Sequence, residues 1–338
     1  MIEPTLLLGD CMAAMGSLED NSIHAVCTDP PYGLTEFSSR EVEKLRAGRG
    51  GVWRLPPSWD GCARRPLPRF TILSSEQRKE IEVFFKKWAA VLWPKLRPGG
   101  HVLIAGNPTL QMYVQNAMVS VDFENRGTVL RVYHGFRGGD RPKNAEKEFP
   151  DVCVTPRGNY EPWMLFRKPI SERTVADNLR KWETGGLRML EGGKPLPDVI
   201  PSFKTPACER AIVDHPSLKP QHLMRILVRA LLPLGRGLIL DPFMGGGSTL
   251  AAASIIGYDS IGFEIDPEYF ELAKRAIFPL SALYPDMDGS VIETPLTKYA
   301  PVEEDESCTR LYLLEKAEGN MDNVKSVKRN RKAKSAQN

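Results

Sequence analysis

The chain has 338 residues, of which 42% are hydrophobic and 26% are charged, with 45 Lys and Arg against 42 Asp and Glu. This composition is that of an ordinary globular protein, so it excludes a wholly disordered chain and a collagen-like fibre, and no apolar run is long enough to span a membrane. The formal charge of +3 says little as a sum, but basic residues concentrate in residues 36–70 and in the last sixteen residues.

Strands and helices are predicted to alternate through the first half of the chain. Strands are expected at residues 5–9, 23–28, 101–105, 128–133, 152–155 and 162–167, and the first two read as buried. Helices are expected at residues 11–18, from a Ser74 or Ser75 cap to about residue 93, and from about residue 108. Residues 36–70 are rich in Arg, Gly and Pro and predict a long loop.

The second half begins with a change of composition. Apolar periodicity fades over residues 169–214, which we interpret as an inserted module. Helices are then predicted at residues 220–232, 248–256 and from 267, with strands at 237–240 and 260–265. The alternation predicts an α/β fold with a mostly parallel, doubly wound sheet, followed by a tail with little order.

A glycine-rich loop at residues 241–249 (DPFMGGGST) follows one of these strands and opens a helix. Glycine permits positive φ and close approach of the backbone to a ligand, and the first amides of the helix are unpaired donors. Glu264, at the end of the next strand, is placed to accept hydrogen bonds from ribose hydroxyls. The loop therefore predicts a site for a nucleoside-bearing cofactor, with a simple strand-to-helix turn as the alternative.

A second motif, Asp29-Pro30-Pro31-Tyr32, follows the strand at residues 23–28. Consecutive prolines make a rigid turn with exposed carbonyls. A carboxylate and a carbonyl could grip an amino group, draw off positive charge that develops during attack on a methyl donor, and leave Tyr32 to stack on a planar base. The alternative is a Pro-rich turn with Tyr32 in the core.

Four motifs in this order resemble the amino-group DNA methyltransferases, which use S-adenosylmethionine to methylate adenine N6 or cytosine N4. They are residues 7–11 (LLGDC), 28–33 (TDPPYG), 215–220 (HPSLKP) and 241–249. The DPPY motif precedes the FxGxG-type loop, as in the β arrangement of the family, and residues 160–170 (YEPWMLFRKPI) resemble a stretch of phage and bacterial members. The resemblance covers residues 5–168 and 213–280 and implies a Rossmann-like methyltransferase fold with circularly permuted motif order.

The resemblance also implies a division of the chain. Residues 1–168 would form the catalytic part, 169–214 a target-recognition insertion, 215–280 the cofactor-binding part of the same domain, and 281–338 a tail that is basic at its end. The strands at 237–240 and 260–265 would lie beside the strand at 5–9, so that the chain ends meet in the middle of one sheet.

S-adenosylmethionine is the cofactor that the resemblance implies. Its expected binding residues are Asp10, Lys219, Phe243, Gly245, Gly247, Ser248, Thr249 and Glu264. Glu264 would hold the ribose, Asp10 would read the cofactor adenine, and Lys219 would line the methionine end. Asp10 could instead simply cap the following helix, and Lys219 could be a solvated residue.

The expected catalytic residues are Asp29, Pro30 and Tyr32, which would transfer a methyl group directly to the amino group of a base flipped out of double-stranded DNA, without a metal. Adenine is favoured over cytosine because Asp, rather than Ser, stands at position 29. Residues 36–70 and 137–143 are further candidates for phosphate contact. Methylation of RNA or of a protein glutamine, an NAD oxidoreductase and a non-enzymatic DNA-binding protein are less favoured alternatives.

Cellular context follows from simpler features. The six cysteines form no Cys-x-x-Cys pair, so neither a zinc site nor a disulfide framework is expected, and the N-terminus lacks the pattern of a signal peptide. We therefore expect a cytoplasmic protein of a bacterium or phage. No nuclease motif is visible; a companion restriction enzyme and a homodimeric state are left open.

Overall fold

The structure is a computed structural model and describes residues 1–32, 73–133, 142, 145, 147–156, 158–215 and 217–284. The predicted loop at 36–70, nearly all of the basic stretch at 137–143 and the tail beyond residue 284 lie outside the described residues. Gly33 and Pro216 of the predicted motifs also lie outside them. No helix of the part that is described has the length and apolar character needed to cross a membrane.

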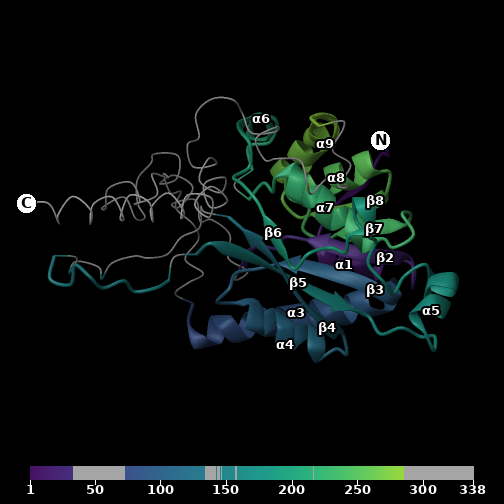
Figure 1. The fold of residues 1–338 in the computed structure, drawn as a ribbon, viewed down its shortest axis with the longest axis horizontal. Coiled ribbons are helices and arrows are strands. Elements are labelled where there is room, and N and C mark those ends of the chain that lie inside the picture. Colours follow the sequence, from purple (N-terminus) through teal and green to yellow (C-terminus); the bar gives the residue numbers. More distant parts are fainter. Residues whose placement is uncertain are drawn as a thin grey trace, which may run out of the picture.

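Eight strands of the described residues form one sheet in the order β1-β8-β7-β2-β3-β5-β4-β6 (Figure 1). They are β1 (Thr5–Leu8), β2 (Ile23–Thr28), β3 (Leu96–Ala105), β4 (Glu124–Val132), β5 (Tyr160–Arg167), β6 (Val199–Pro201), β7 (Leu238–Asp241) and β8 (Asp259–Glu264). Only β5 runs antiparallel to its two neighbours, β3 and β4. The other strands therefore end at one edge of the sheet, where β5 begins. The predicted mostly parallel α/β sheet is confirmed.

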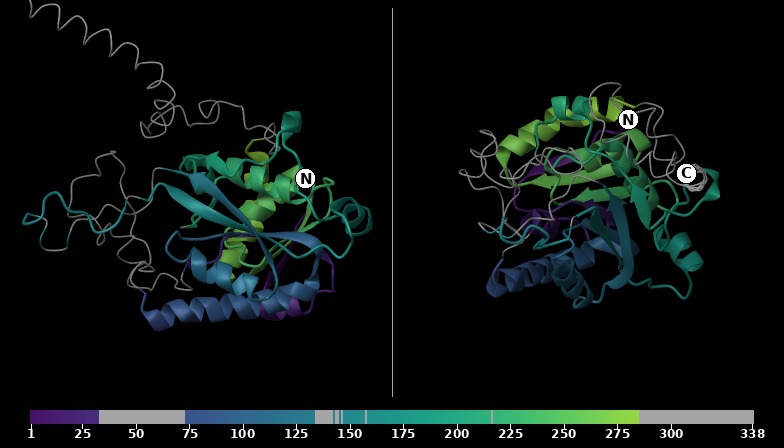
Figure 2. Two further views of the ribbon diagram at one scale, coloured as in Figure 1. Left: turned by 60° about the horizontal axis from the view of Figure 1, so that its bottom comes forward. Right: turned by 60° about the vertical axis from the view of Figure 1, so that its left-hand side comes forward.

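Helices cover both faces of this sheet. They are α1 (Cys11–Gly16), α3 (Ser75–Lys95), α4 (Gln111–Val119), α5 (Val175–Trp182), α6 (Ala207–Ile212), α7 (Gln221–Leu231), α8 (Ser248–Ile256) and α9 (Pro267–Ala282), with a 3-10 turn at Glu191–Gly193. Figures 1 and 2 show α3 and α4 together on one side and α7, α8 and α9 on the other. The fold is thus a three-layer arrangement, as the alternation of elements predicts.

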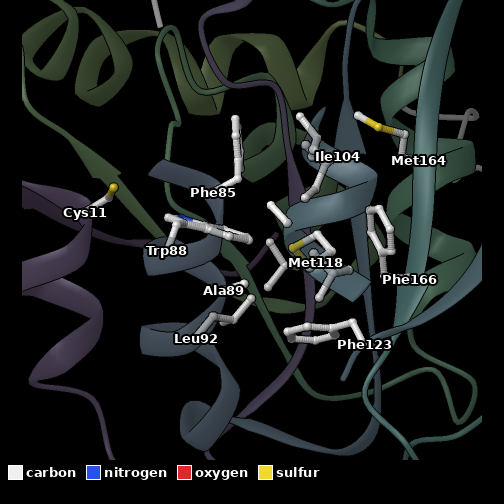
Figure 3. Close-up of a cluster of buried hydrophobic side chains, with 14 of the residues drawn as sticks. Cys11, Phe85, Trp88, Ala89, Leu92, Ile104, Met118, Phe123, Met164 and Phe166 are labelled. Atoms are coloured by element: carbon white, nitrogen blue, oxygen red, sulfur yellow. The ribbon is translucent and has the colours of Figure 1, made fainter. Parts of the chain in front are cut away.

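Each face carries its own apolar core. On one face α3 buries Ile81, Phe85, Trp88, Ala89 and Leu92, a stripe at helical spacing. Figure 3 shows this cluster, which also contains Ile104 of β3, Met118 of α4 and Phe166 of β5. On the other face the almost wholly buried helix α7 packs with α8 over the alternate side chains of β2 and β3. The central strands are buried on both faces, which explains their continuous apolar sequence.

The position of β1 corrects two expectations. Residues 5–9 were expected to be buried, but β1 is an edge strand, and its Leu7 and Leu8 are 41% and 51% exposed. Among the strands of the described residues it pairs only with β8, because β7 lies one strand further in, next to β2. The two halves of the chain therefore meet in the middle of the sheet at the β2–β7 pair and not at β1.

Two further element predictions need correction. Residues 152–155 form no strand, and Val152 and Val154 are exposed, because both edges of β5 are already paired with β3 and β4. Residues 97–100 were expected to separate a helix from a strand that starts at residue 101. Instead β3 begins at Leu96, and Gly99 (φ +81°) lies where a Cβ atom would meet the backbone of Gly185 at 2.8 Å.

Residues 169–214 are built onto the main sheet. They supply β6, which pairs in parallel with β4 at the edge opposite to β1. They also supply α5, whose buried Asn178 donates hydrogen bonds from Nδ2 to the carbonyl oxygens of Pro98 in β3 and of Thr184. The segment therefore contacts the sheet at two places, along β4 and near the start of β3.

The N-terminus of α3 offers a test of the local structure. Ser74 Oγ accepts a hydrogen bond from Gln77 N, and Gln77 Oε1 accepts one from Ser74 N. Ser74→Ala should therefore lower the free energy of unfolding by about 1 kcal/mol in urea titrations followed by circular dichroism. Ser75→Ala, one position later, should lower it by less than about 0.5 kcal/mol. Equal losses in the two variants would contradict the assignment of the cap.

Candidate active site

Acidic side chains gather at the shared edge where the parallel strands end. Asp29 follows β2, Asp241 ends β7 and Glu264 ends β8, and these three strands are adjacent in the sheet. Glu161 lies at the start of β5, which begins at the same edge because it runs in the opposite direction. Ligands of open α/β sheets bind outside this edge, so it is the first place to look for a site.

The predicted glycine-rich loop joins β7 to α8 at this edge. Gly245 and Gly247 adopt φ angles of +48° and +82°, which only glycine tolerates well, and α8 begins at Ser248 without a side-chain cap. Gly245 N donates a hydrogen bond to Glu264 Oε2 at 2.9 Å. The Phe243 ring packs against Trp88 of α3 with centroids 6.4 Å apart. The structure thus brings the loop and Glu264 together.

Asp241 connects the two halves of the chain at the sheet centre. Its Oδ1 accepts hydrogen bonds from Thr28 Oγ1 at 2.6 Å and from Phe243 N at 3.1 Å. Burial raises the pKa of Asp241 to about 6, although the hydrogen bonds partly oppose this shift. The hydrogen bond to Thr28 fixes the glycine-rich loop relative to the Asp29 turn, a contact that the sequence analysis did not predict.

The Asp29 turn holds a buried ion pair. Lys219 Nζ lies 2.8 Å from Asp29 Oδ2, and only 16% of the Asp29 side chain is exposed. Burial raises the pKa of Asp29, against the opposing charge of Lys219. Burial opposes protonation of Lys219, but the charges of Asp29 and Glu161 outweigh it and raise the Lys219 pKa. Asp29 Oδ1 is buried and accepts no hydrogen bond from the described residues.

Glu161 is the main site residue that the sequence analysis missed. Its Oε1 accepts hydrogen bonds from Tyr32 Oη at 2.8 Å and Lys219 Nζ at 2.9 Å. Its Oε2 accepts from Arg131 Nη1 at 3.2 Å and Trp163 Nε1 at 3.1 Å. Burial opposes ionisation, but the charges of Lys219 and Arg131 lower the Glu161 pKa to about 2. The only signal in the sequence was a lone acid in an otherwise apolar strand.

The predicted catalytic and cofactor residues fall into two groups and one outlier. Asp29, Tyr32 and Lys219 lie together, with the Lys219 ammonium 5.6 Å from the centre of the Tyr32 ring. Lys219 thus lies beside Asp29 and Tyr32. Its contact with the methionine end of a cofactor stays a prediction. Phe243, Gly245, Gly247, Ser248, Thr249 and Glu264 form the second group.

Asp10 is the outlier. Its Oδ1 accepts hydrogen bonds from Met12 N at 3.1 Å and Ala13 N at 3.0 Å, so it caps α1. The residue before it, Gly9, donates its N–H to the Glu264 carbonyl oxygen at 2.8 Å, which keeps Asp10 near the second group. The alternative, that Asp10 caps the following helix, is therefore confirmed. Recognition of the cofactor adenine by Asp10 stays a prediction. Within the described ranges no three His, Cys, Asp or Glu side chains are placed to hold a metal ion.

Comparisons with known proteins agree with this arrangement. The family model for DNA methylases designated N6_N4_Mtase matches residues 23–275. The chain is 32% identical over 274 residues to the Type II methyltransferase M2.DpnII of Streptococcus pneumoniae, covering 80% of this chain and 88% of that protein. It is 23% identical over 296 residues to the Type II methyltransferase M.HindIII of Haemophilus influenzae, covering 79% and 93%.

A solved structure shares the fold. The PvuII DNA methyltransferase, described as cytosine-N4-specific, superposes with a TM-score of 0.53 at 15% sequence identity, covering 86% of this chain and 94% of that one. At this identity the likeness concerns the fold alone.

Gly247 allows the packing of the glycine-rich loop to be tested. A Cβ atom there would lie 2.6 Å from Ile277 Cγ1 of α9, whereas one at Gly257 (φ +87°) would meet nothing within 4 Å. Both Gly→Ala changes should cost about 1–2 kcal/mol for the left-handed backbone. Gly247→Ala should cost about 1–3 kcal/mol more because of overpacking. Urea unfolding measures both, and equal costs would show that the Ile277 contact is unimportant.

Asp241 predicts a pH dependence of stability. Because burial raises its pKa from an ordinary 3.8 to about 6, the stability that this group contributes is complete below pH 4 and is lost as pH rises through 6. Asp241→Asn keeps the shape and an acceptor but does not titrate. The free energy of unfolding of the wild type minus that of the variant should fall by about 2 kcal/mol between pH 4 and pH 7. A difference that stays constant across urea titrations at these pH values would contradict the shift.

Proposed function

This chain belongs to the N6/N4 DNA methylase family, and from that premise we propose that it transfers a methyl group from S-adenosylmethionine to the N6 amino group of an adenine in DNA. The observation that carries the proposal is the buried Asp29 Oδ1, an acceptor without a partner among the described residues. A buried acceptor of this kind is costly unless a ligand satisfies it, and an amino group is a donor that would do so.

Asp29 acts on the amine. One N–H of the amino group donates a hydrogen bond to Asp29 Oδ1, and the other donates to the Pro30 carbonyl oxygen. This arrangement turns the nitrogen lone pair toward the methyl donor. As the N–C bond forms and the C–S bond breaks, positive charge grows on the nitrogen and the Asp29 carboxylate stabilises it. Lys219 favours the ionised form of Asp29 throughout, and the surplus amine proton leaves through Asp29 or solvent.

Tyr32 acts on the base. An adenine within a duplex cannot reach a methyl donor bound at this site, so it has to leave the helix. The Tyr32 ring, half-buried beside Asp29, offers a face on which the extruded base stacks. Residues 169–214 would recognise the target sequence, and the basic residues of 36–70 and 137–143 would contact phosphates.

The second group of residues fits S-adenosylmethionine, which supplies a methyl group on a positively charged sulfur when bound. Glu264 offers a carboxylate to ribose hydroxyls at the end of β8. Gly245 and Gly247 adopt the positive φ angles with which the loop turns into α8, and Phe243, Ser248 and Thr249 would complete the cofactor site. Asp10 would read the cofactor adenine from the neighbouring end of β1.

Adenine is proposed over cytosine because Asp rather than Ser begins the DPPY tetrapeptide. The test is the identity of the methylated base. Unmethylated plasmid DNA incubated with the protein and S-adenosylmethionine, then hydrolysed and analysed by mass spectrometry, should contain N6-methyladenine. N4-methylcytosine would overturn the choice of base, and DNA without either product would overturn the proposal.

Asp29→Ala should lower the rate of methyl transfer by more than about 100-fold, because the amine loses its acceptor and the nearest negative charge. Calorimetry should show S-adenosylmethionine binding within about threefold of the wild type, since Glu264 and the glycine-rich loop are untouched. Asp20→Ala is a matched control, because Asp20 forms an ion pair with Lys95 at 2.8 Å, away from the site. If Asp29→Ala transfers methyl groups as fast as the control, Asp29 is not catalytic.

A further inference from the structure

Glu161, at the start of β5, contacts both the neighbouring strand β4 and the turn that contains Asp29 and Tyr32. Its side chain is 3% exposed, yet it receives four hydrogen bonds from four different side chains. The donors divide between its two oxygens: Tyr32 and Lys219 reach Oε1, and Arg131 and Trp163 reach Oε2. One oxygen therefore faces the site and the other faces the sheet.

The sheet side of Glu161 is fixed by buried groups. Arg131 of β4 lies opposite Glu161 in the sheet and also donates hydrogen bonds to Ser202 Oγ at 3.0 Å and the Phe203 carbonyl oxygen at 2.9 Å. Trp163 lies two residues further along β5 and is fully buried. Strands β4 and β5 and the segment after β6 thus hold Oε2 in place. If the carboxylate moved away, the buried Arg131 guanidinium would lose the negative charge of its ion pair with Glu161, which is strongly unfavourable.

The site side of Glu161 holds two groups of the proposed mechanism. A hydrogen bond to Oε1 fixes the Tyr32 hydroxyl and so restricts rotation of the ring on which the base would stack. The same oxygen holds the Lys219 ammonium, whose other contact is Asp29 Oδ2. Because Lys219 contacts Oδ2, Oδ1 is the Asp29 oxygen left without a partner among the described residues, and it is the one that would accept from the amine.

We propose that Glu161 is a positioning residue for methyl transfer, which sets the orientation of Tyr32 and the location of Lys219 against Asp29. This inference rests on the proposed function, because it concerns the reaction that Asp29 and Tyr32 carry out. Glu161 touches neither base nor cofactor in this scheme. Its effect on the rate comes through two hydrogen bonds of one oxygen atom.

The main test is Glu161→Gln, which keeps the length and one acceptor oxygen but removes the charge and replaces one acceptor by a donor. Single-turnover transfer of a labelled methyl group to plasmid DNA should slow by about 10- to 100-fold, since small errors in position are costly at the reacting centre. The dissociation constant for S-adenosylmethionine, measured by calorimetry, should change by less than about threefold. Retained binding also shows that the variant is folded.

Glu124→Gln is the matched control. Glu124 belongs to the same pair of strands, β4 and β5, and forms an ion pair with Arg167 at 2.7 Å. This ion pair lies at the opposite ends of these two strands from Glu161. The variant should transfer methyl groups within about twofold of the wild-type rate. A loss of rate as large as that of Glu161→Gln would mean that any broken ion pair on these strands slows transfer, and it would overturn the positioning role.

Tyr32→Phe keeps the inference testable if Glu161→Gln fails to fold, because it removes only the hydroxyl group that Oε1 holds. It should slow single-turnover transfer by about tenfold, and transfer at the wild-type rate would overturn the inference. Where both variants fold, the double variant should be slowed by clearly less than the product of the two single effects. A full product would show that Glu161 does not act through Tyr32 and would likewise overturn it.

Failure of this inference differs from failure of the proposed function. A wild-type protein that transfers no methyl group to DNA overturns both. A wild-type protein that methylates DNA, together with Glu161→Gln and Tyr32→Phe variants that do so equally fast, overturns the role of Glu161 alone.

Discussion

The arrangement of the site depends on one buried ammonium group shared by two carboxylates. Lys219 lies just before α7, yet its Nζ bridges Asp29 at the end of β2 and Glu161 at the start of β5, across the intervening β3. Removing one partner from such a pair leaves an unpaired buried charge, which costs about 3–5 kcal/mol. Three segments that are far apart in the sequence are thus held at fixed distances by charge.

The strand order explains why a permuted sequence can build this site. The glycine-rich loop follows β7, and Glu264 is the last residue of β8. These are the last two strands along the chain, yet β7 pairs with β2, and Asp29 directly follows β2. Parallel pairing brings both strand ends to one edge, and the Thr28–Asp241 hydrogen bond fixes them side by side. The groups proposed for the methyl donor therefore adjoin those proposed for its acceptor, whichever half of the chain comes first.

Periodicity and turn residues predicted most elements, including β2 and the exact span of α8, because these depend on local sequence. They could not show that β1 lies at an edge, since a short apolar run looks alike whether one or two strands flank it. Glu161 was missed for a related reason: an acid at the start of a strand lies at this edge only if that strand runs antiparallel. Direction and neighbours are properties of the whole sheet. Lys219 was recognised from its motif, but its partners depend on the same topology.

The charges of the site also suit the chemistry that they surround. Asp29 and Glu161 carry two negative charges and Lys219 and Arg131 two positive ones, so the network is neutral when Asp29 is ionised. In the proposed reaction, a neutral amine would then bind without changing the net charge of this buried network. Positive charge would appear on the amine in this reaction only as the methyl group arrives, and the Asp29 carboxylate would already be in place to stabilise it. The carboxylate would therefore stabilise the transition state more than the ground state, because the ground-state amine offers it only a hydrogen bond.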